Sequence, residues 1–160
     1  MKYAHLLEEY AAGPDQLAEM ISEMTSEQID ARPVPGKWST REVVCHLADF
    51  EPIYADRIKR VLVEDKPLLM GGDPDTFAEG LGYDVRNLDN ELTLMRAVRQ
   101  QIREILSNVP EEAFQRVGQH SRDGEISIEV LLKRITGHIP HHVALIEEKK
   151  RALGIYPPQP

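Results

Sequence analysis

The chain has 160 residues, of which 41% are hydrophobic and 29% are charged, and its formal net charge is -8 at pH 7. This size and mixture predict one soluble globular domain that buries its own core. The acidic charge would repel a phosphate backbone, and no basic stripe with interleaved aromatic residues offsets it, so we expect no nucleic-acid partner.

No stretch of the sequence approaches the roughly 18 consecutive apolar residues that cross a membrane, so we expect no membrane partner. The first residues, MKYAHLLEEYAAGPDQL, lack the uninterrupted apolar core of a secretory signal. The single cysteine, Cys45, excludes an intramolecular disulfide and fits a reducing compartment. The sequence therefore predicts a cytoplasmic protein.

The first half of the chain predicts two helices. Residues 3–24 carry apolar side chains at helical spacing, and Gly13-Pro14 predicts a break or kink within this first helix. The stretch ARPVPGKW then predicts a loop. A second helix is expected over about 40–64, with Ser39 and Glu42 as its capping box and a bend at Pro52.

The connection KPLLMGGDPDTFAEGLGYD is rich in glycine, proline and aspartate and is too long for a simple turn, so it is a candidate functional loop. Its Asp73 and Asp75 could bind a cation, but Asx-type turns are the favoured interpretation. A third helix is predicted over about 86–108.

The last part of the chain predicts a short helix at PEEAF, a turn at HSRDGEIS and a final helix that Ser127 caps and Gly154 ends. No convincing strand alternation occurs. Four long apolar stripes joined by loops predict an all-α fold, a four-helix bundle. We expect a single domain over residues 1–154, followed by a proline-rich C-terminal tail over residues 155–160.

Three of the six histidines fall in the stretch GHIPHH. His138 and His142 occupy the middle of an apolar seam on the last helix, four residues apart, which is the geometry that two imidazoles need to bind one metal ion. Such pairs also occur by chance on exposed helices, and the seam position is what favours a metal site. His141 falls on a different flank, and we leave it outside the site.

The second helix carries a matching histidine. His46 is the first polar member of a seam with Val43 and Phe50, and Asp49 could orient its imidazole, ligate the metal directly or act as a base. The alternative is that His46 is a hydrogen-bonded core residue. Three histidines from two helices, with one coordination position free, would form a catalytic metal site.

Two other residues are weaker candidates. Cys45 directly precedes His46, but one residue is about 100° around a helix, so we expect a buried, inert thiol that points away from the metal. His120 precedes a turn, and we expect a surface or loop histidine, although a loop can fold over the mouth of a bundle.

Several segments together resemble the DinB-like superfamily, closest to its YfiT-type branch: GKWSTREVVCHLADFE, the Arg57 that follows, HSRDGEISIEVLL and GHIPHHVALI. The resemblance implies a bundle with an up-down-down-up arrangement and a divalent metal on His46, His138 and His142. Zinc or nickel is the expected metal, with manganese or iron as alternatives. Members of the family are often homodimers, and the resemblance implies the same here.

Characterised members of this family include thiol S-transferases, which join low-molecular-weight thiols such as bacillithiol or mycothiol to electrophiles. Our leading hypothesis is therefore a metal-dependent thiol S-transferase, because a coordinated thiol loses its proton at neutral pH. Asp49 would help to orient His46 or remove the proton. Arg57, Lys37 and Arg41 are the cations that could hold an acidic thiol.

Two alternatives stay open. A hydrolase would use the same histidines to activate water. A non-catalytic, metal-stabilised stress-response or ligand-binding bundle would instead close the coordination sphere with Asp49 or His120. An accessible cavity lined by the 67–83 loop would favour catalysis.

Overall fold

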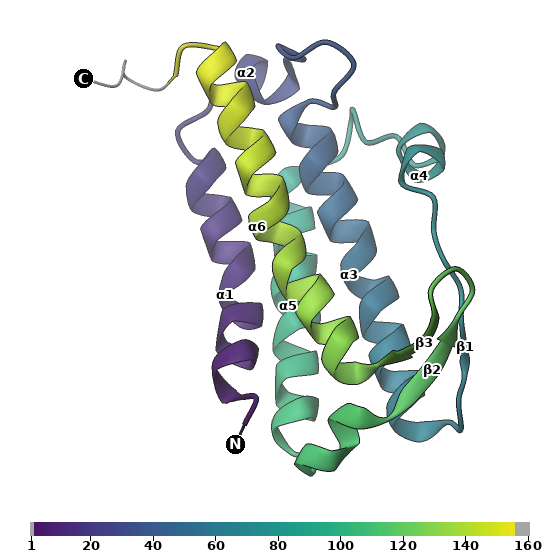
Figure 1. Ribbon diagram of the computed structural model, residues 1–160. Coiled ribbons are helices and arrows are strands. Elements are labelled where there is room, and N and C mark those ends of the chain that lie inside the picture. The colour runs from purple at the N-terminus through teal and green to yellow at the C-terminus, as the bar shows by residue number, and fades with distance from the viewer. Residues whose placement is uncertain (1, 156–160) are drawn as a thin grey trace.

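The computed structural model describes residues 2–155. Its framework is a bundle of long helices (Figure 1). The long helices are α1 (Ala4–Ile21), α3 (Thr40–Val63), α5 (Leu88–Ser107) and α6 (Ile128–Ala152). Helices α1 and α6 run in one direction and α3 and α5 in the other, because the connection after α3 returns along the outside of the bundle (Figure 1). The predicted up-down-down-up four-helix bundle is confirmed.

Shorter elements lie in the connections between the long helices. They are α2 (Ser26–Asp30), β1 (Leu68–Leu69), α4 (Pro74–Gly80), the 3-10 helix η1 (Glu111–Gln115), β2 (Val117–His120) and β3 (Gly124–Ser127). The strands form one sheet in the order β1-β2-β3, in which β1 is parallel and β3 antiparallel to β2. The expectation that strands are absent was wrong, since strands of two to four residues are too short to show an alternating pattern.

Side-chain caps fix where the two histidine-bearing helices begin. Ser39 accepts a hydrogen bond from the backbone of Glu42, whose carboxylate accepts one from the backbone of Ser39, so the predicted capping box is confirmed. Ser127 caps α6 by accepting from the backbone N–H of Val130. These caps set the first turn of each helix and hence the phase of every later residue.

Helix α1 is continuous through Gly13-Pro14, so the predicted interruption was wrong. Pro14 cannot donate to the carbonyl of Tyr10. Arg99 of α5 donates to that carbonyl instead, from Nη1 at 2.6 Å. Gly13 makes the approach possible, because a Cβ atom there would lie 2.3 Å from Arg99 Nη1. A side chain from another helix thus replaces the hydrogen bond that proline removes.

Arg99 also forms a buried ion pair with Glu51 of α3, and both side chains are at most 1% exposed. Its Nε lies 2.9 Å from Glu51 Oε1, and its Nη2 donates to the carbonyl of Ile135 in α6 at 3.0 Å. Arg99 itself belongs to α5, so all the long helices meet at this residue. Arg99 and its partners form a polar layer between two apolar clusters. One cluster surrounds Ile58, Ile102 and Leu131, and the other surrounds Leu47, Met95 and Ile139.

The C-terminal tail predicted over residues 155–160 lies outside the described residues except for Ile155, which packs against the second apolar cluster. Within residues 2–155, no helix is both long and apolar enough to cross a bilayer.

Candidate metal centre

The three predicted histidines come together between α3 and α6. The ring centroids of His46 and His138 are 4.9 Å apart, those of His46 and His142 4.8 Å, and those of His138 and His142 4.9 Å. The Nε2 atoms of His46 and His138 are 3.0 Å from each other. One nitrogen from each of the three rings lies within 4.8 Å of the other two. Ligand nitrogens on a tetrahedral zinc ion lie roughly 3.4 Å apart, so the 3.0 Å between His46 and His138 suits a shared ion, while a pair at the 4.8 Å limit would have to move closer.

The electrostatic state of the rings also suits a metal ion. Burial lowers the pKa of His46 to about 4 and the pKa values of His138 and His142 to about 3. All three imidazoles are therefore neutral at pH 7, which is the form that binds metals. Their Nδ1 atoms are buried without a hydrogen-bond partner among residues 2–155. The donor set of this cluster fits a metal site.

Aromatic side chains pack against the histidine cluster. The Trp38 ring lies 5.2 Å from His46, and the Phe50 ring lies 4.7 Å from His46 and 6.1 Å from His138. Phe77 of α4 packs against Phe50 at 5.7 Å. Phe50 could be placed from its position four residues after His46, whereas nothing in the spacing of the loop singles out Phe77.

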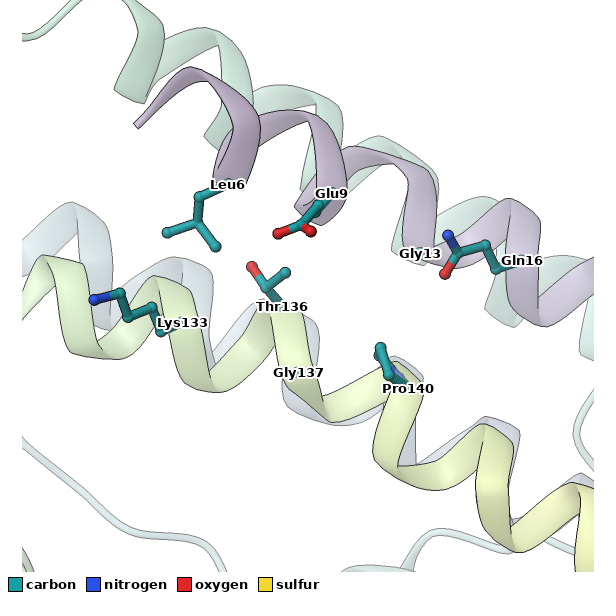
Figure 2. Close-up of a pocket in the computed structure, with 8 residues that line it drawn as sticks. All are labelled: Leu6, Glu9, Gly13, Gln16, Lys133, Thr136, Gly137 and Pro140. Carbon is teal, nitrogen blue, oxygen red and sulfur yellow. The ribbon is translucent and has the colours of Figure 1, made fainter. Parts of the chain in front are cut away.

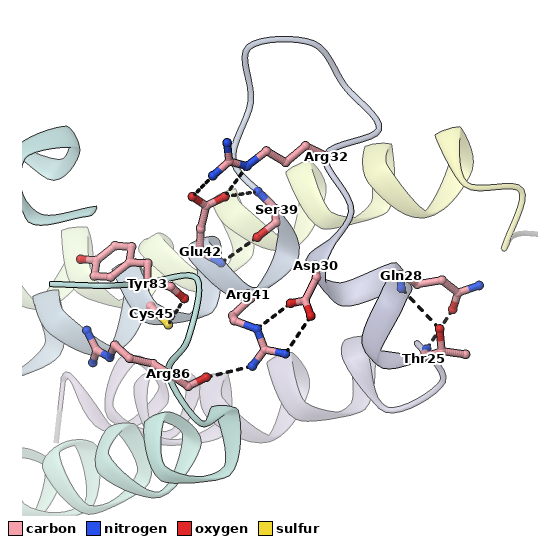
Figure 3. Close-up of polar contacts among 10 residues, drawn as sticks. All are labelled: Thr25, Gln28, Asp30, Arg32, Ser39, Arg41, Glu42, Cys45, Tyr83 and Arg86. Atoms are coloured by element: carbon pink, nitrogen blue, oxygen red, sulfur yellow. Dashed lines mark hydrogen bonds and ion pairs between the residues drawn. The ribbon is translucent and has the colours of Figure 1, made fainter. Parts of the chain in front are cut away.

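Asp49 is hydrogen-bonded to Arg86 and not to His46 in the described structure, and the role that we expected for it beside His46 stays a prediction. Arg86 binds both of its carboxylate oxygens, from Nη1 and Nη2 at 2.9 Å each, and also donates to Glu91. The backbone carbonyl of Arg86 in turn accepts from Arg41 at 2.8 Å (Figure 3). Asp49 therefore anchors the loop before α5 onto α3. Sequence spacing could not reveal this, because Arg86 lies 37 residues further along the chain.

The weaker candidates lie outside the cluster. His120 is buried in the β2–β3 hairpin, where its Nδ1 accepts from the backbone N–H groups of Arg122 and Asp123, both at 3.3 Å. His141 is exposed, although its ring is 5.1 Å from that of His142.

Cys45 is fully buried and its Sγ donates to the carbonyl of Tyr83 at 3.5 Å (Figure 3). Burial raises the pKa of the Cys45 thiol to about 12, so the expectation of an inert thiol agrees with its surroundings. Asp73 accepts from the backbone of Thr76 and caps α4, as the turn interpretation requires.

The structure contains a cavity of about 470 Å³ beside α3. Its lining includes Arg57 of α3 and, from the 67–83 loop, Met70, Gly72 and Phe77. Phe77 touches the Phe50 ring, which in turn touches the histidines, so one aromatic ring separates this cavity from the cluster. A cavity lined by this loop is what the catalytic hypotheses require.

A second groove, of about 340 Å³, runs between α1 and α6 (Figure 2). Its α6 wall consists of Lys133, Thr136, Gly137 and Pro140. At about 100° per residue, these positions lie on the side of α6 opposite to His138 and His142. The groove is therefore separate from the candidate metal centre.

Comparisons with known proteins agree with this geometry. A model of the DinB superfamily matches residues 9–146. YfiT of Bacillus subtilis, provisionally named a metal-dependent hydrolase, is 29% identical over 154 residues, which cover 96% of this chain and 85% of the relative. A Bacillus licheniformis protein with the same provisional name is 30% identical over 144 residues, covering 88% of this chain and 81% of the relative. The solved structure of YfiT, described as an unusual four-helix bundle, matches with a TM-score of 0.88 at 26% identity, over 94% of this chain and 86% of that chain.

Proposed function

The chain belongs to the DinB superfamily, and from this premise we propose that it is a metal-dependent enzyme in which His46, His138 and His142 hold one divalent transition metal ion. The observation that carries the proposal is the convergence of three neutral imidazoles from two helices, of which His46 and His142 are buried and His138 is half-buried. Imidazole donors suit zinc, nickel and iron, and zinc or nickel is our first expectation.

A free coordination position supports catalysis over a purely structural metal. Among residues 2–155, no fourth histidine, cysteine, aspartate or glutamate joins the trio. Asp49 is bound by Arg86, and His120 accepts from its own turn, so neither of the fourth ligands considered above is available in this arrangement. Structural metal sites are almost always closed by four protein ligands, whereas catalytic sites keep one position for water or substrate.

The reaction that we propose is the transfer of a low-molecular-weight thiol to an electrophile. A divalent metal held by the trio would lower the pKa of a thiol beside it, so that the thiolate forms near neutral pH. The thiol loses its proton to bulk water, the sulfur forms an S–C bond to the electrophilic carbon, and the bond from that carbon to the leaving group breaks, so that the leaving group departs with its electron pair. Trp38 and Phe50 form an apolar wall against His46 that limits the access of competing water.

Hydrolysis is the second candidate, and the provisional names of the relatives favour it. The same histidines would serve a metal that lowers the pKa of water instead of a thiol. The two reactions are distinguished by incubating metal-loaded protein with an activated electrophile in the presence and absence of cysteine. Release of the leaving group that requires cysteine supports thiol transfer, whereas release at the same rate without it supports hydrolysis.

The first test is metal content, measured by elemental mass spectrometry on tag-free protein. We expect near-stoichiometric transition metal in the wild type and its loss in His142→Ala. His141→Ala is the matched control, because this neighbouring histidine is exposed and outside the trio. Equal metal in all three proteins, or none in any of them after incubation with zinc, nickel, manganese or iron, would refute the proposal.

A further inference from the structure

Arg57 is a buried cation whose Nε lacks a hydrogen-bond acceptor among the described residues, although its side chain also interacts with Met70 and Tyr54. Its side chain is packed over the Tyr54 ring, and the residue is 5% exposed. Its Nη2 donates to the carbonyl of Met70. Within residues 2–155, its Nε has no hydrogen-bond partner and no carboxylate oxygen lies within 4.0 Å of the guanidinium. A buried donor without an acceptor, on a charged group, is costly and therefore marks a place where a ligand can bind.

The other two cations that we considered for an acidic substrate are already paired. Lys37 binds Glu148 at 2.7 Å, and Arg41 binds Asp30 at 2.6 Å. Arg57 differs from both because it has no such partner in the described structure.

Two carboxylates near Arg57, in the chain or in space, are engaged with other cations. Asp56, its neighbour in the chain, is bound by Arg60 at 2.8 Å. Asp123, in the hairpin turn beside it, is bound by Arg134 at 2.5 Å. Protein groups therefore do not supply the anion that this guanidinium could bind, and a ligand could.

The place for such a ligand is the cavity of about 470 Å³, since Arg57 is among its lining residues. This volume is in the range of small-molecule sites. Gly71 and Gly72 also line this cavity, and a Cβ atom on Gly72 would lie 3.4 Å from Phe50 Cζ. The glycine at this position keeps the loop close to the aromatic ring that borders the histidines.

The cavity and the histidines also share one face of α3. His46, Phe50, Ile53 and Arg57 follow one another at intervals of four, three and four residues, which places them on one side of the helix. Eleven residues correspond to about 16 Å along the helix axis, and helical side chains lean toward the N-terminus, which shortens the distance from the guanidinium to the cluster. One elongated small molecule could therefore reach both places.

We propose that this cavity binds a carboxylate of the molecule that reacts at the three histidines, with Arg57 as the positioning residue. The planar guanidinium would hold the carboxylate through Nε and an Nη nitrogen, a two-point geometry that lysine cannot reproduce. The substrate class is thus an extended small molecule that carries a carboxylate at the end remote from its reacting atom. The statement that this molecule reacts at the three histidines rests on the proposed function, whereas the statement that Arg57 binds a carboxylate does not.

The experiment is a nuclear magnetic resonance titration of the full-length, metal-free protein with succinate and with its neutral diamide, succinamide. The Nε–Hε resonance of Arg57, identified by its absence in Arg57→Lys, reports directly on the unused donor. We expect succinate to shift it in a saturable way and succinamide to leave it unchanged. Binding followed through backbone amides should weaken by about tenfold or more in Arg57→Lys. Arg60→Lys is the matched control, because Arg60 lines the same cavity but is already paired, and it should bind as the wild type does.

Equal shifts with succinamide, an unchanged affinity in Arg57→Lys, an equal loss in Arg60→Lys, or no saturable shift with succinate would each overturn the proposal. The comparison of the two ligands on the wild type needs no variant, so it stands even if Arg57→Lys folds poorly. His142→Ala should bind succinate as the wild type does. If metal binding fails while succinate binding persists, the proposed function falls and the carboxylate site stands.

Discussion

The bundle contains two polar centres in its interior that both involve α3 and α6, and they differ in how their groups are satisfied. At the first, Arg99 donates to Glu51 and to the carbonyls of Tyr10 and Ile135, so the chain itself completes the arrangement. At the second, three histidines leave their Nδ1 atoms without partners in the described structure. The hydrogen bonds of the first centre are completed by the chain, whereas those of the second are not completed by the described residues.

The largest expected effect comes from removing one partner at the satisfied centre. Arg99→Met should lower the free energy of unfolding by about 3 to 5 kcal/mol, because the Glu51 carboxylate would be left buried and uncompensated. Urea denaturation measures the change. The double variant Arg99→Met with Glu51→Leu should recover part of the loss, and a double variant as unstable as the single one would show that the ion pair is not the cause.

The histidine centre should be revealed by acid in the metal-free protein. The pKa values of about 3 to 4 in the folded state lie below the ordinary value of 6.5, so the unfolded chain binds more protons below that pH. The free energy of unfolding should therefore be highest above pH 6.5. It should fall as the pH drops toward 4, by roughly 1 kcal/mol per pH unit for each histidine.

Urea midpoints at pH 7, 6 and 5 test this dependence. The triple variant His46→Gln, His138→Gln and His142→Gln should show a much flatter dependence on pH. A slope that the triple variant does not reduce would assign the acid sensitivity to other groups.

Adding a single methyl group at Gly13 tests the close packing against Arg99, and the same change at Gly137 serves as the control. Gly13→Ala should destabilise the protein by about 1 to 3 kcal/mol, because the added Cβ would meet Arg99 Nη1 at 2.3 Å. Gly137→Ala in α6 meets nothing within 4 Å and should stabilise by about 0.5 to 1 kcal/mol, as alanine does in a helix interior. Thermal denaturation of both variants is sufficient, and the same sign for both would contradict the assignment.

The smallest effect on stability should come from the histidines themselves at neutral pH without metal. His138→Leu should change the free energy of unfolding by less than about 1 kcal/mol in either direction, because the Nδ1 of His138 has no partner in the described structure and only its Nε2 contacts another polar group, His46 Nε2 at 3.0 Å. Urea denaturation at pH 7.5 in the presence of a chelator measures this. A loss as large as that of Arg99→Met would mean that the trio forms a satisfied network like the first centre.

Sequence periodicity was sufficient for the long helices and for the meeting of the three histidines. His46, His138 and His142 interrupt apolar seams at three-four spacing, and such seams face the core, so the pattern allowed the three to meet, and the family resemblance implied the same trio. The homodimer and the cytoplasmic location stay predictions.

The features that could not be predicted are those that depend on partners distant in the chain. The unbroken helix at Pro14 requires Arg99, and the engagement of Asp49 requires Arg86, and no local rule connects these residues. The short strands escaped detection because β1 and β2 pair across about 50 residues and expose too few positions for a period to appear. The unpaired state of Arg57 likewise depends on which neighbouring carboxylates other cations have bound.

The position of Arg99 also bears on how the protein unfolds. Because this one side chain bonds to residues of α1, α3 and α6, detachment of any of these helices breaks a hydrogen bond of Arg99, and detachment of α5 breaks all of them. Partial opening would leave a charge in an apolar layer, so such states should be sparsely populated. Amide protons in the middle of all the long helices should then exchange with solvent only through global unfolding, with one common free energy, rather than in separate local steps.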